Sequence, residues 1–323
     1  MGKKHIALIT DDNYCFPTLV CIKSIINNAA ESNDYVIHVC AFGLTESNVT
    51  KLRNLSTSNV TVVIDLFNAT QYEAKLKQIS QKTHVTPTAL IKFELPNYFS
   101  ELDTLLYIDG DIIIKNNIDS LLDMPLGSAY LAGSYEFHSR LNKINYSFKR
   151  DYDDFYFNSG VMLLNLDSMR KDDITEKLWY YKINHAKTRL MDQESLNAVC
   201  GHNTVPLSLV WNFNPVFLRD KYLAEINNVY KTTFMDVSKL EESVNIIHYV
   251  GKLDKPWIYK EATLRRYWDC TLDSYDESIK LELKSFERDT PGFVESSKSK
   301  ISLFGIKGYL CFLINRLRNS TLI

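Results

Sequence analysis

The first hundred residues alternate between strand-like and helix-like segments, and this alternation constrains the fold more than any other feature of the chain. Short apolar, β-branched runs predict strands, and apolar residues spaced three and four apart predict helices. Strands joined by helices pair in parallel, so we expect an α/β fold with a mainly parallel sheet and helices on both faces. The expected elements are a strand at Ile6–Thr10, a helix at Thr18–Asn28, a strand at Tyr35–Phe42, a helix at Glu46–Leu55 and a strand at Val60–Leu66.

The pattern continues beyond residue 85 and changes near residue 290. We expect a helix over residues 86–100, a strand at Val161–Leu166, and helices at Asp173–His185 and Gln193–Val199. A breaker cluster at 289–292 predicts a boundary between a domain of residues 1–288 and a segment of residues 289–323. This segment is basic and amphipathic, with no acidic residue after Glu295. It fits a helix at an anionic membrane interface, or equally a final helix docked on the domain with a solvated basic face.

Composition narrows the class of protein. With 323 residues and 45% hydrophobic content, the chain is long enough for a substantial core. A net charge of -2 argues against a broad nucleic-acid-binding surface. The six cysteines lack metal-finger spacing, and no stretch resembles a signal peptide or a membrane span, so a reduced, cytoplasmic compartment is expected.

One pair of acids is set among strand-forming residues. Asp109, Gly110 and Asp111 lie between two apolar runs in the stretch 105–114, which predicts a buried strand that carries two carboxylates to its end. Strand residues two apart project to the same side, so both carboxylates could meet one cation, and Gly110 would let a ligand approach the backbone. Hard oxygen ligands of this kind suit Mg2+ or Mn2+.

Polar residues also follow the first expected strand. Thr10, Asp11, Asn13 and Tyr14 stand where a dinucleotide-binding fold or a P-loop would need a glycine-rich turn, so both of those classes are disfavoured. Carboxylate, amide and phenol groups suit a nucleoside instead. Taken alone, the acids equally suit a helix N-cap.

Three later blocks carry similar ambiguity. Asn158 precedes an expected strand, Asp192 and Gln193 open an expected helix, and His248 ends an apolar run. Capping or turn formation explains the first two on spacing alone. A histidine at the end of an apolar run is more often a core or turn residue than a ligand, although beside a diphosphate it could complete a metal shell while a lysine neutralises phosphate.

Read in order, these blocks resemble glycosyltransferase family 8, which includes bacterial lipopolysaccharide galactosyl- and glucosyltransferases and, more distantly, glycogenin. The resemblance covers roughly residues 5 to 260, and several blocks in the right order are far more specific than any one alone. The blocks are Thr10–Tyr14, Leu106–Asp111, Phe157–Gly160, Asp192–Gln193, His248–Gly251 and Lys255–Trp257.

The resemblance implies a GT-A fold, a UDP-sugar donor, Mn2+ (with Mg2+ as the alternative) and transfer of galactose or glucose with retention to a glycan or lipid-linked glycan acceptor. It also implies roles for individual residues. The metal would be held by Asp109, Asp111 and His248. The donor would be contacted by Thr10, Asp11, Asn13, Tyr14, Lys92, Asp109, Gly110, Asn158, Gly251 and Lys255. Catalytic contacts at the sugar would come from Asp192 and Gln193, and His84 would lie on the acceptor side.

Two departures from the family pattern stand out. Lys92 occupies a position that is usually Arg, and a lysine keeps the charge but loses the planar fork. The segment from Gly251 to Lys255 is one residue longer than usual, so either Lys252 or Lys255 could meet the diphosphate. The residues do not identify the hexose, the acceptor or the oligomeric state.

Mechanistically, the resemblance favours attack by the acceptor on the face that UDP leaves. A double displacement is the alternative, but Gln193 is a poor nucleophile compared with a carboxylate. A catalytically silent sugar-nucleotide-binding or scaffold protein of the same fold is a second hypothesis. A metal-dependent phosphoryl-transfer or hydrolytic enzyme is a third, and it would need a nucleophile-activating base or phosphate loop that the sequence lacks.

Overall fold

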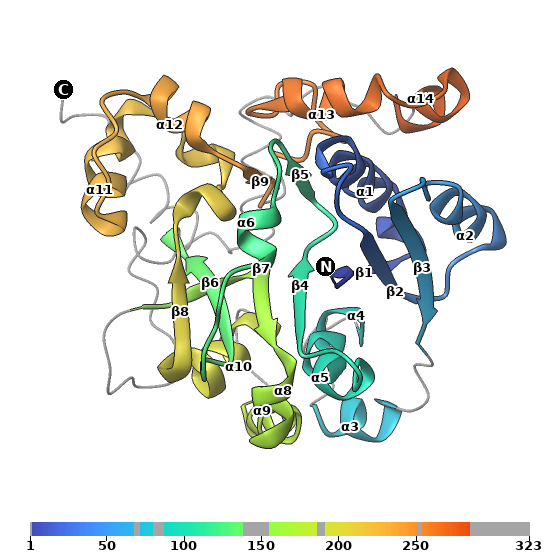
Figure 1. The fold of residues 1–323 in the computed structure, drawn as a ribbon, viewed down its shortest axis with the longest axis vertical. Coiled ribbons are helices and arrows are strands. Elements are labelled where there is room, and N and C mark those ends of the chain that lie inside the picture. Colours follow the sequence, from blue (N-terminus) through green and yellow to red (C-terminus); the bar gives the residue numbers. More distant parts are fainter. Residues whose placement is uncertain are drawn as a thin grey trace, which may run out of the picture.

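The computed structural model describes residues 2–67, 72–79, 87–137, 155–185, 191–250 and 254–284. Within these ranges one sheet of seven strands runs through the molecule, and helices cover both of its faces (Figure 1). The first four strands pair in parallel, β7 is antiparallel to both of its neighbours, and β8 is parallel to β6. The predicted α/β fold with a mixed sheet is therefore confirmed. In sheet order the strands are β3 (Val60–Leu66), β2 (Tyr35–Phe42), β1 (Lys4–Asp11), β4 (Thr104–Ile108), β7 (Phe157–Asn165), β6 (Leu131–Tyr135) and β8 (Thr204–Leu207).

The helices form the outer layers, and their apolar faces explain which side of the sheet each one covers. Leu19 and Ile22 of α1 pack with strand residues of one face, and Leu178 and Leu196, from α9 and α10, pack against the other. Burial of such side chains on both faces is what a parallel sheet requires. The helices are α1 (Cys15–Asn28), α2 (Glu46–Arg53), α3 (Glu73–Gln78), α4 (Pro87–Leu90), α5 (Leu95–Tyr98), α6 (Asp119–Leu122), α8 (Leu166–Lys171), α9 (Ile174–Asn184), α10 (Met191–Cys200), α11 (Asp220–Tyr230), α12 (Val237–Ser243), α13 (Arg265–Leu272) and α14 (Glu277–Lys284).

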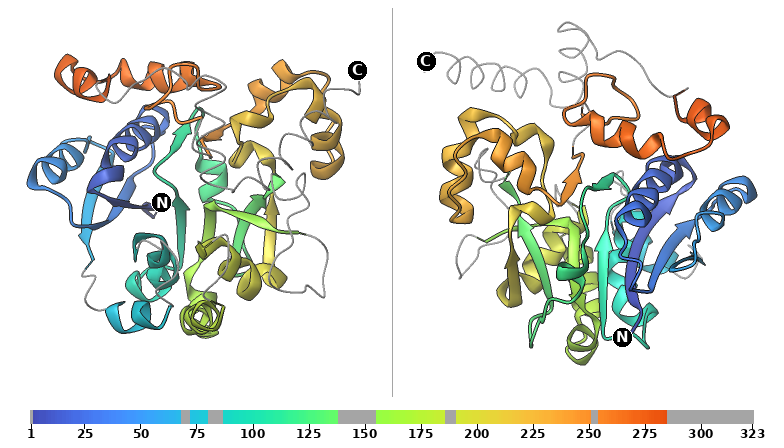
Figure 2. Two further views of the ribbon diagram at one scale, coloured as in Figure 1. Left: turned by 180° about the vertical axis from the view of Figure 1, so that it is seen from behind. Right: turned by 45° about the horizontal axis from the view of Figure 1, so that its top comes forward.

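The last two described helices are α13 and α14, and the C-terminal helical extension predicted at residues 289–323 lies outside the described residues. Helices α13 and α14 lie over α1 and α2 at one end of the molecule (Figure 2). The Tyr275 hydroxyl, just after α13, donates to the Leu19 carbonyl of α1 at 2.7 Å, and Lys51 of α2 forms an ion pair with Glu282 of α14 at 2.7 Å. These contacts connect the end of the described chain to its first helices.

Two elements differ from the sequence prediction for identifiable reasons. The single helix expected over 86–100 is instead α4, a 3₁₀ turn at Ile91–Glu94, and α5. Pro96 lies in the first turn of α5, where its missing N–H is harmless, whereas within a continuous helix it would remove a hydrogen bond. The strand expected at Val161–Leu166 begins four residues earlier, because Phe157 pairs with Tyr135 of β6. The Asn197 side chain bonds both the N–H and the C=O of Phe157.

A small second sheet brings distant parts of the chain together. β5 (Ile112–Ile114) pairs antiparallel with β9 (Ile246–His248), and Ile112 faces His248 in this register. The pair lies beyond the end of β4, where the N-terminal end of β7 also reaches the same edge (Figure 1). The polar blocks of the sequence therefore converge at this edge of the main sheet.

Some predictions fall on parts of the chain that are not described. His84, Gly251 and Lys252 lie outside the described residues, as do the boundary expected near 289 and the whole segment 289–323. Among the helices that are described, none combines the length and apolarity needed to cross a membrane.

Candidate active site

Two carboxylates lie in the turn that joins β4 to β5. β4 ends at Ile108, and Gly110 and Asp111 turn the chain before Ile112 begins β5. The two acids lie at the end of a buried strand, as predicted, but the expectation that both project from the strand itself is wrong, because the chain turns at Gly110 and Asp111. Backbone bonds hold the turn at each end: the Asp109 N–H donates to the Gly160 carbonyl at 2.8 Å, and the Tyr249 N–H donates to the Asp111 carbonyl at 3.0 Å.

These two acids meet a histidine from the other end of the sequence. Ligand atoms of Asp109, Asp111 and His248 all lie within 4.8 Å of one another. His248 Nε2 is 3.2 Å from Asp111 Oδ1 and 3.7 Å from Asp109 Oδ2. The strand register that sets Ile112 opposite His248 produces this arrangement, because Asp111 directly precedes Ile112. We call Asp109, Asp111 and His248 the acidic cluster.

Two lysines form ion pairs with the carboxylates of the acidic cluster. The buried Lys92 ammonium is 3.1 Å from Asp109 Oδ1 and 2.8 Å from Asp192 Oδ2, and it lies over the Tyr107 ring. The Lys255 ammonium pairs with Asp111 Oδ2 and donates to the Tyr249 carbonyl at 2.6 Å. Lysine at position 92 thus bridges two carboxylates, even without the planar fork of an arginine.

These charges shift the acid–base equilibria of their neighbours. Burial opposes ionisation of Asp111, but Lys255 and His248 outweigh it, and the pKa of the carboxyl falls well below its usual value. Burial likewise opposes the charge on Lys92, yet Asp109 and Asp192 raise the pKa of the ammonium. Burial, followed by the charges of Asp111 and Asp109, raises the pKa of Tyr14. At neutral pH the Asp111 carboxyl is therefore ionised, Lys92 is cationic and the Tyr14 phenol is neutral.

The polar residues at the end of β1 and directly after it have different roles, and only some of them contact the acidic cluster. Asp11 Oδ1 accepts the Tyr14 N–H at 3.0 Å, so this carboxylate caps the 3₁₀ turn Asp12–Tyr14, which is the capping alternative left open by the sequence. The Tyr14 hydroxyl donates to Asp111 Oδ2 at 3.1 Å, and its ring meets Trp257 edge-on. Thr10 is buried and accepts from the Thr18 hydroxyl, while Asn13 is exposed.

A second group of polar side chains lies where β7 meets α10. Ser159 connects both of the predicted catalytic residues: its hydroxyl donates to Asp192 Oδ2 at 2.9 Å, and its N–H donates to Gln193 Oε1 at 3.1 Å. Gln193 Nε2 and Asn158 Nδ2 both donate to Glu136 Oε2, at 3.3 and 2.7 Å. Since Lys92 contacts Asp192 as well as Asp109, this group is continuous with the acidic cluster.

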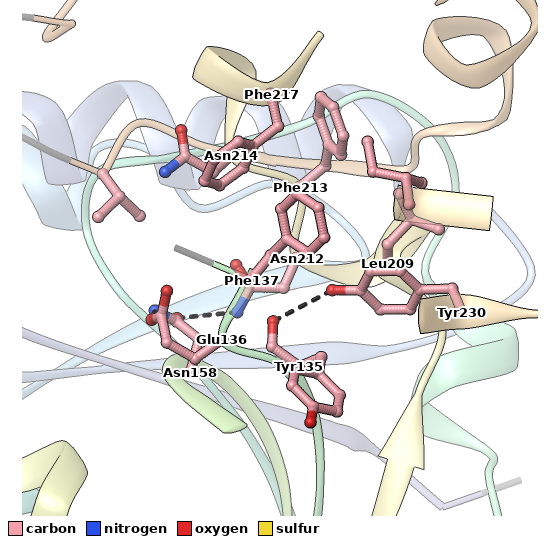
Figure 3. Close-up of a pocket in the computed structure, with 12 residues that line it drawn as sticks. Tyr135, Glu136, Phe137, Asn158, Leu209, Asn212, Phe213, Asn214, Phe217 and Tyr230 are labelled. Atoms are coloured by element: carbon pink, nitrogen blue, oxygen red, sulfur yellow. Dashed lines mark hydrogen bonds between the residues drawn. The ribbon is translucent and has the colours of Figure 1, made fainter. Parts of the chain in front are cut away.

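The sequence analysis missed Glu136 and Asn212. Glu136 directly follows the apolar strand β6, as Asp109 follows β4, and that similarity was the available signal. Asn212 follows a 3₁₀ turn at Leu209–Trp211 and has no comparable signal. Figure 3 shows both beside Asn158 at one side of a hollow. The hollow has an aromatic wall formed by Tyr135, Phe137, Phe213, Phe217 and Tyr230.

The architecture is that of the GT-A fold. The chain superposes on the galactosyltransferase LgtC, whose structure was solved in complex with donor and acceptor sugar analogs, with a TM-score of 0.65 and 24% sequence identity. The match covers 85% of this chain and 98% of LgtC. This likeness establishes the fold.

The family model described as Glycosyl transferase family 8 matches residues 5–261, and the chain belongs to this family of glycosyltransferases. It is 28% identical to the Lipopolysaccharide 1,2-glucosyltransferase of Escherichia coli over 257 residues, which cover 76% of this chain and 71% of that protein. It is 25% identical to General stress protein A of Bacillus subtilis over 265 residues, which cover 78% and 87% of the two chains. The family resemblance inferred from the ordered sequence blocks is confirmed.

The acidic cluster suits a divalent cation. Two carboxylates and an imidazole nitrogen are donors that Mn2+ accepts, and a carboxylate-rich set with one imidazole also tolerates Mg2+. A cationic group already lies against Asp111, since the Lys255 ammonium is paired with it. The residues present therefore fit a positive ion without rearrangement of the backbone.

Proposed function

We propose that this chain is a metal-dependent, retaining glycosyltransferase that transfers galactose or glucose from a UDP-sugar to a glycan acceptor. The observation that supports this most strongly is the acidic cluster, flanked by Lys92 and Lys255, at the edge of a GT-A sheet. Carboxylates that hold a cation, with lysines beside them, are suited to the diphosphate of a sugar nucleotide.

In this proposal Asp109, Asp111 and His248 hold Mn2+, with Mg2+ as a possible substitute. When bound, the ion supplies electrostatic stabilisation of the charge that develops on the departing diphosphate. When the donor binds, the Lys255 ammonium leaves Asp111 and pairs with the diphosphate instead. Among the described residues, this ammonium is the cationic group nearest to the Asp111 carboxylate. Lys252 is the alternative for the same contact.

The remaining residues bind the two ends of the donor. Thr10, Asp11, Asn13 and Tyr14 contact uridine, and Gly110 lets the phosphates approach the backbone. At the sugar end Asn158 and Asp192 hydrogen-bond the hexose hydroxyls. Gly251 would contact the diphosphate, and His84 the acceptor, from outside the described residues.

Retention follows if the acceptor hydroxyl attacks on the face that UDP leaves, with a β-phosphate oxygen taking its proton. The Gln193 amide is hydrogen-bonded at both ends and is a weak nucleophile. Glu136, the carboxylate to which Gln193 Nε2 donates, accepts two hydrogen bonds at Oε2, which reduces its nucleophilicity. Both observations favour same-face attack over a double displacement.

For the acceptor we propose a glycan or lipid-linked glycan of a bacterial cell surface. The similarity to the Lipopolysaccharide 1,2-glucosyltransferase of Escherichia coli supports this class. A cytoplasmic enzyme acting on a lipid-linked acceptor would work at the inner face of the membrane, and the basic, apolar residues 289–323 suit contact with anionic lipid.

The test is UDP release from a panel of UDP-sugars, with Mn2+ and with EDTA. We expect turnover of one donor that EDTA abolishes and that Asp109→Ala lowers by at least about 100-fold, because a first metal ligand is lost. Asp123→Ala is the matched control: this carboxylate is exposed and pairs with Lys4, so turnover should be unchanged.

Other outcomes separate the competing hypotheses. Binding of a UDP-sugar without turnover under any condition would favour a silent sugar-nucleotide-binding or scaffold protein. Equal turnover in EDTA, or in Asp109→Ala, would contradict the metal assignment. Slow hydrolysis without acceptor would not by itself indicate a hydrolase, because transferases also leak to water.

A further inference from the structure

Asn212 joins the two halves of the site through a single side chain. Its Oδ1 lies 2.8 Å from His248 Nδ1, and its Nδ2 donates to Asn158 Oδ1 at 2.9 Å. Figure 3 shows the Asn212 amide directed at Asn158, with Glu136 beside them. One side chain therefore contacts both the acidic cluster and the residues at the sugar end.

The surrounding hydrogen bonds determine which way this amide points. Asn158 Oδ1 also accepts the Gly160 N–H at 2.9 Å, and Asn158 Nδ2 donates to Glu136, so an acceptor oxygen of Asn158 faces Asn212. The group of Asn212 that meets it must be the NH2, which leaves the amide oxygen toward His248. An amide oxygen only accepts, so His248 Nδ1 carries a hydrogen, and Nε2 is the ring nitrogen left to ligate a cation.

We propose that Asn212 is a positioning residue of the metal centre: it holds His248 in the tautomer whose Nε2 can ligate a divalent cation. Nε2 is the ring atom that faces Asp111 and Asp109, at 3.2 and 3.7 Å. This inference rests on the proposed metal-dependent function and extends it to a residue that does not touch metal or donor. Partners of a ligating imidazole fix its tautomer and orientation.

The same amide continues the hydrogen-bond chain toward the sugar. From His248 the chain passes through Asn212 and Asn158 to Glu136, which also accepts from Gln193. The orientation of the His248 imidazole is thereby connected, through hydrogen bonds, to the side chains that we expect to contact the hexose. Asn212 has two separable tasks, one at each end of its amide.

The backbone does not depend on this side chain. The Phe213 N–H donates to the Ile246 carbonyl at 3.0 Å, and the His248 N–H donates to the Phe213 carbonyl at 2.9 Å. These bonds attach the segment to β9 whatever residue stands at 212. Removing the Asn212 side chain should thus leave the local fold in place.

The experiment is a calorimetric titration of the full chain with Mn2+, with and without UDP. We expect Asn212→Ala to weaken Mn2+ binding by about 10- to 100-fold. Asn212→Asp should keep Mn2+ binding, because a carboxylate accepts the Nδ1 hydrogen, yet it should lower sugar-transfer kcat, because it cannot donate to Asn158. Wild-type Mn2+ affinity in Asn212→Ala would overturn the inference.

Two controls separate positioning from general effects. Asn214→Ala removes an amide from the same segment that caps the Val216 N–H at 3.1 Å instead, and it should leave Mn2+ affinity unchanged. In a His248→Ala background neither Asn212 variant should change Mn2+ affinity further, since the affected ligand is absent. A gain from Asn212→Asp in that background would mean that negative charge alone is responsible, which overturns the inference.

The proposed function and this inference fail differently. If the wild-type protein binds no Mn2+, with or without UDP, the metal-dependent function is contradicted and the inference falls with it. If the wild-type protein binds Mn2+ and loses it in Asp109→Ala, while Asn212→Ala binds normally, the function stands and the inference alone is overturned.

Discussion

Gly160 leaves no room for a side chain where β7 passes the acidic cluster. A Cβ at this position would overlap the His248 ring and lie 2.8 Å from Asp109 Oδ2. The sequence suggested a turn around Asn158 and Gly160, and this is wrong because both lie within β7. Here glycine is needed for the close approach of a strand to two side chains rather than for an unusual backbone angle.

We therefore expect Gly160→Ala to weaken Mn2+ binding by about tenfold or more, equivalent to about 1.4 kcal/mol, because His248 and Asp109 must separate. Calorimetric titration measures this. Gly127→Ala is the matched control, since Gly127 has φ +55 and open space around it. That change should cost about 1 kcal/mol of stability through backbone strain and leave Mn2+ affinity intact. Equal Mn2+ affinities for wild type and Gly160→Ala would refute the steric argument.

At the level of elements, the buried Asn197 amide of α10 is bonded to the backbone of β7. Asn197 Oδ1 accepts the Phe157 N–H at 2.9 Å, and its Nδ2 donates at 2.8 Å to the carbonyls of Phe157 and Gln193. The helix itself begins at Met191, in a left-handed conformation with φ 49. Apolar spacing predicted a helix at Gln193–Val199. It could not predict the start at Met191, because that start depends on tertiary contacts of the helix with β7.

Asn197→Ala should lower the free energy of unfolding by about 2–3 kcal/mol, because it leaves buried backbone groups of Phe157 unpaired. Urea unfolding, followed by tryptophan fluorescence, provides the measurement. Asn203→Ala removes an exposed bond to the Ser128 carbonyl and should cost less than about 1 kcal/mol. Similar losses of unfolding free energy in the two variants would contradict the prediction that the buried Asn197 amide contributes more to stability than the exposed Asn203 amide.

At the scale of the whole molecule, the sheet carries a row of titratable side chains, one on each of three neighbouring strands. His5 Nδ1 on β1 lies 3.0 Å from His38 Nε2 on β2, and His38 Nδ1 lies 3.1 Å from Asp65 Oδ2 on β3. Burial, followed by the charges of His38 and Lys3, lowers the pKa of His5. Protonation of His5 is therefore easier in the unfolded chain than in the folded sheet.

The direction of the pH effect follows from this shift. The unfolded chain takes up a proton near the ordinary histidine pKa of about 6.5 and the native sheet only at lower pH. The contribution of His5 to stability is thus complete above that value and is lost as pH falls toward the lowered pKa. Between pH 7.5 and 5.5 the wild type should lose more unfolding free energy than His5→Gln, measured by urea unfolding. Parallel pH profiles for the two proteins would contradict the prediction.

The sequence alone determined the alternation of strands and helices from β1 to β3, the class of the fold and the family, because these depend on local apolar patterns and ordered blocks. The strands at Tyr35–Phe42 and Val60–Leu66 match the prediction residue for residue. Tertiary structure alone decided which side chains meet. His248 reaches Asp111 only through the register of β5 with β9, and Glu136 and Asn212 enter the site only through loops that end on the same edge. Such contacts depend on strand register and on pairing between segments far apart in the sequence, which the packing of the whole core determines and no local pattern predicts.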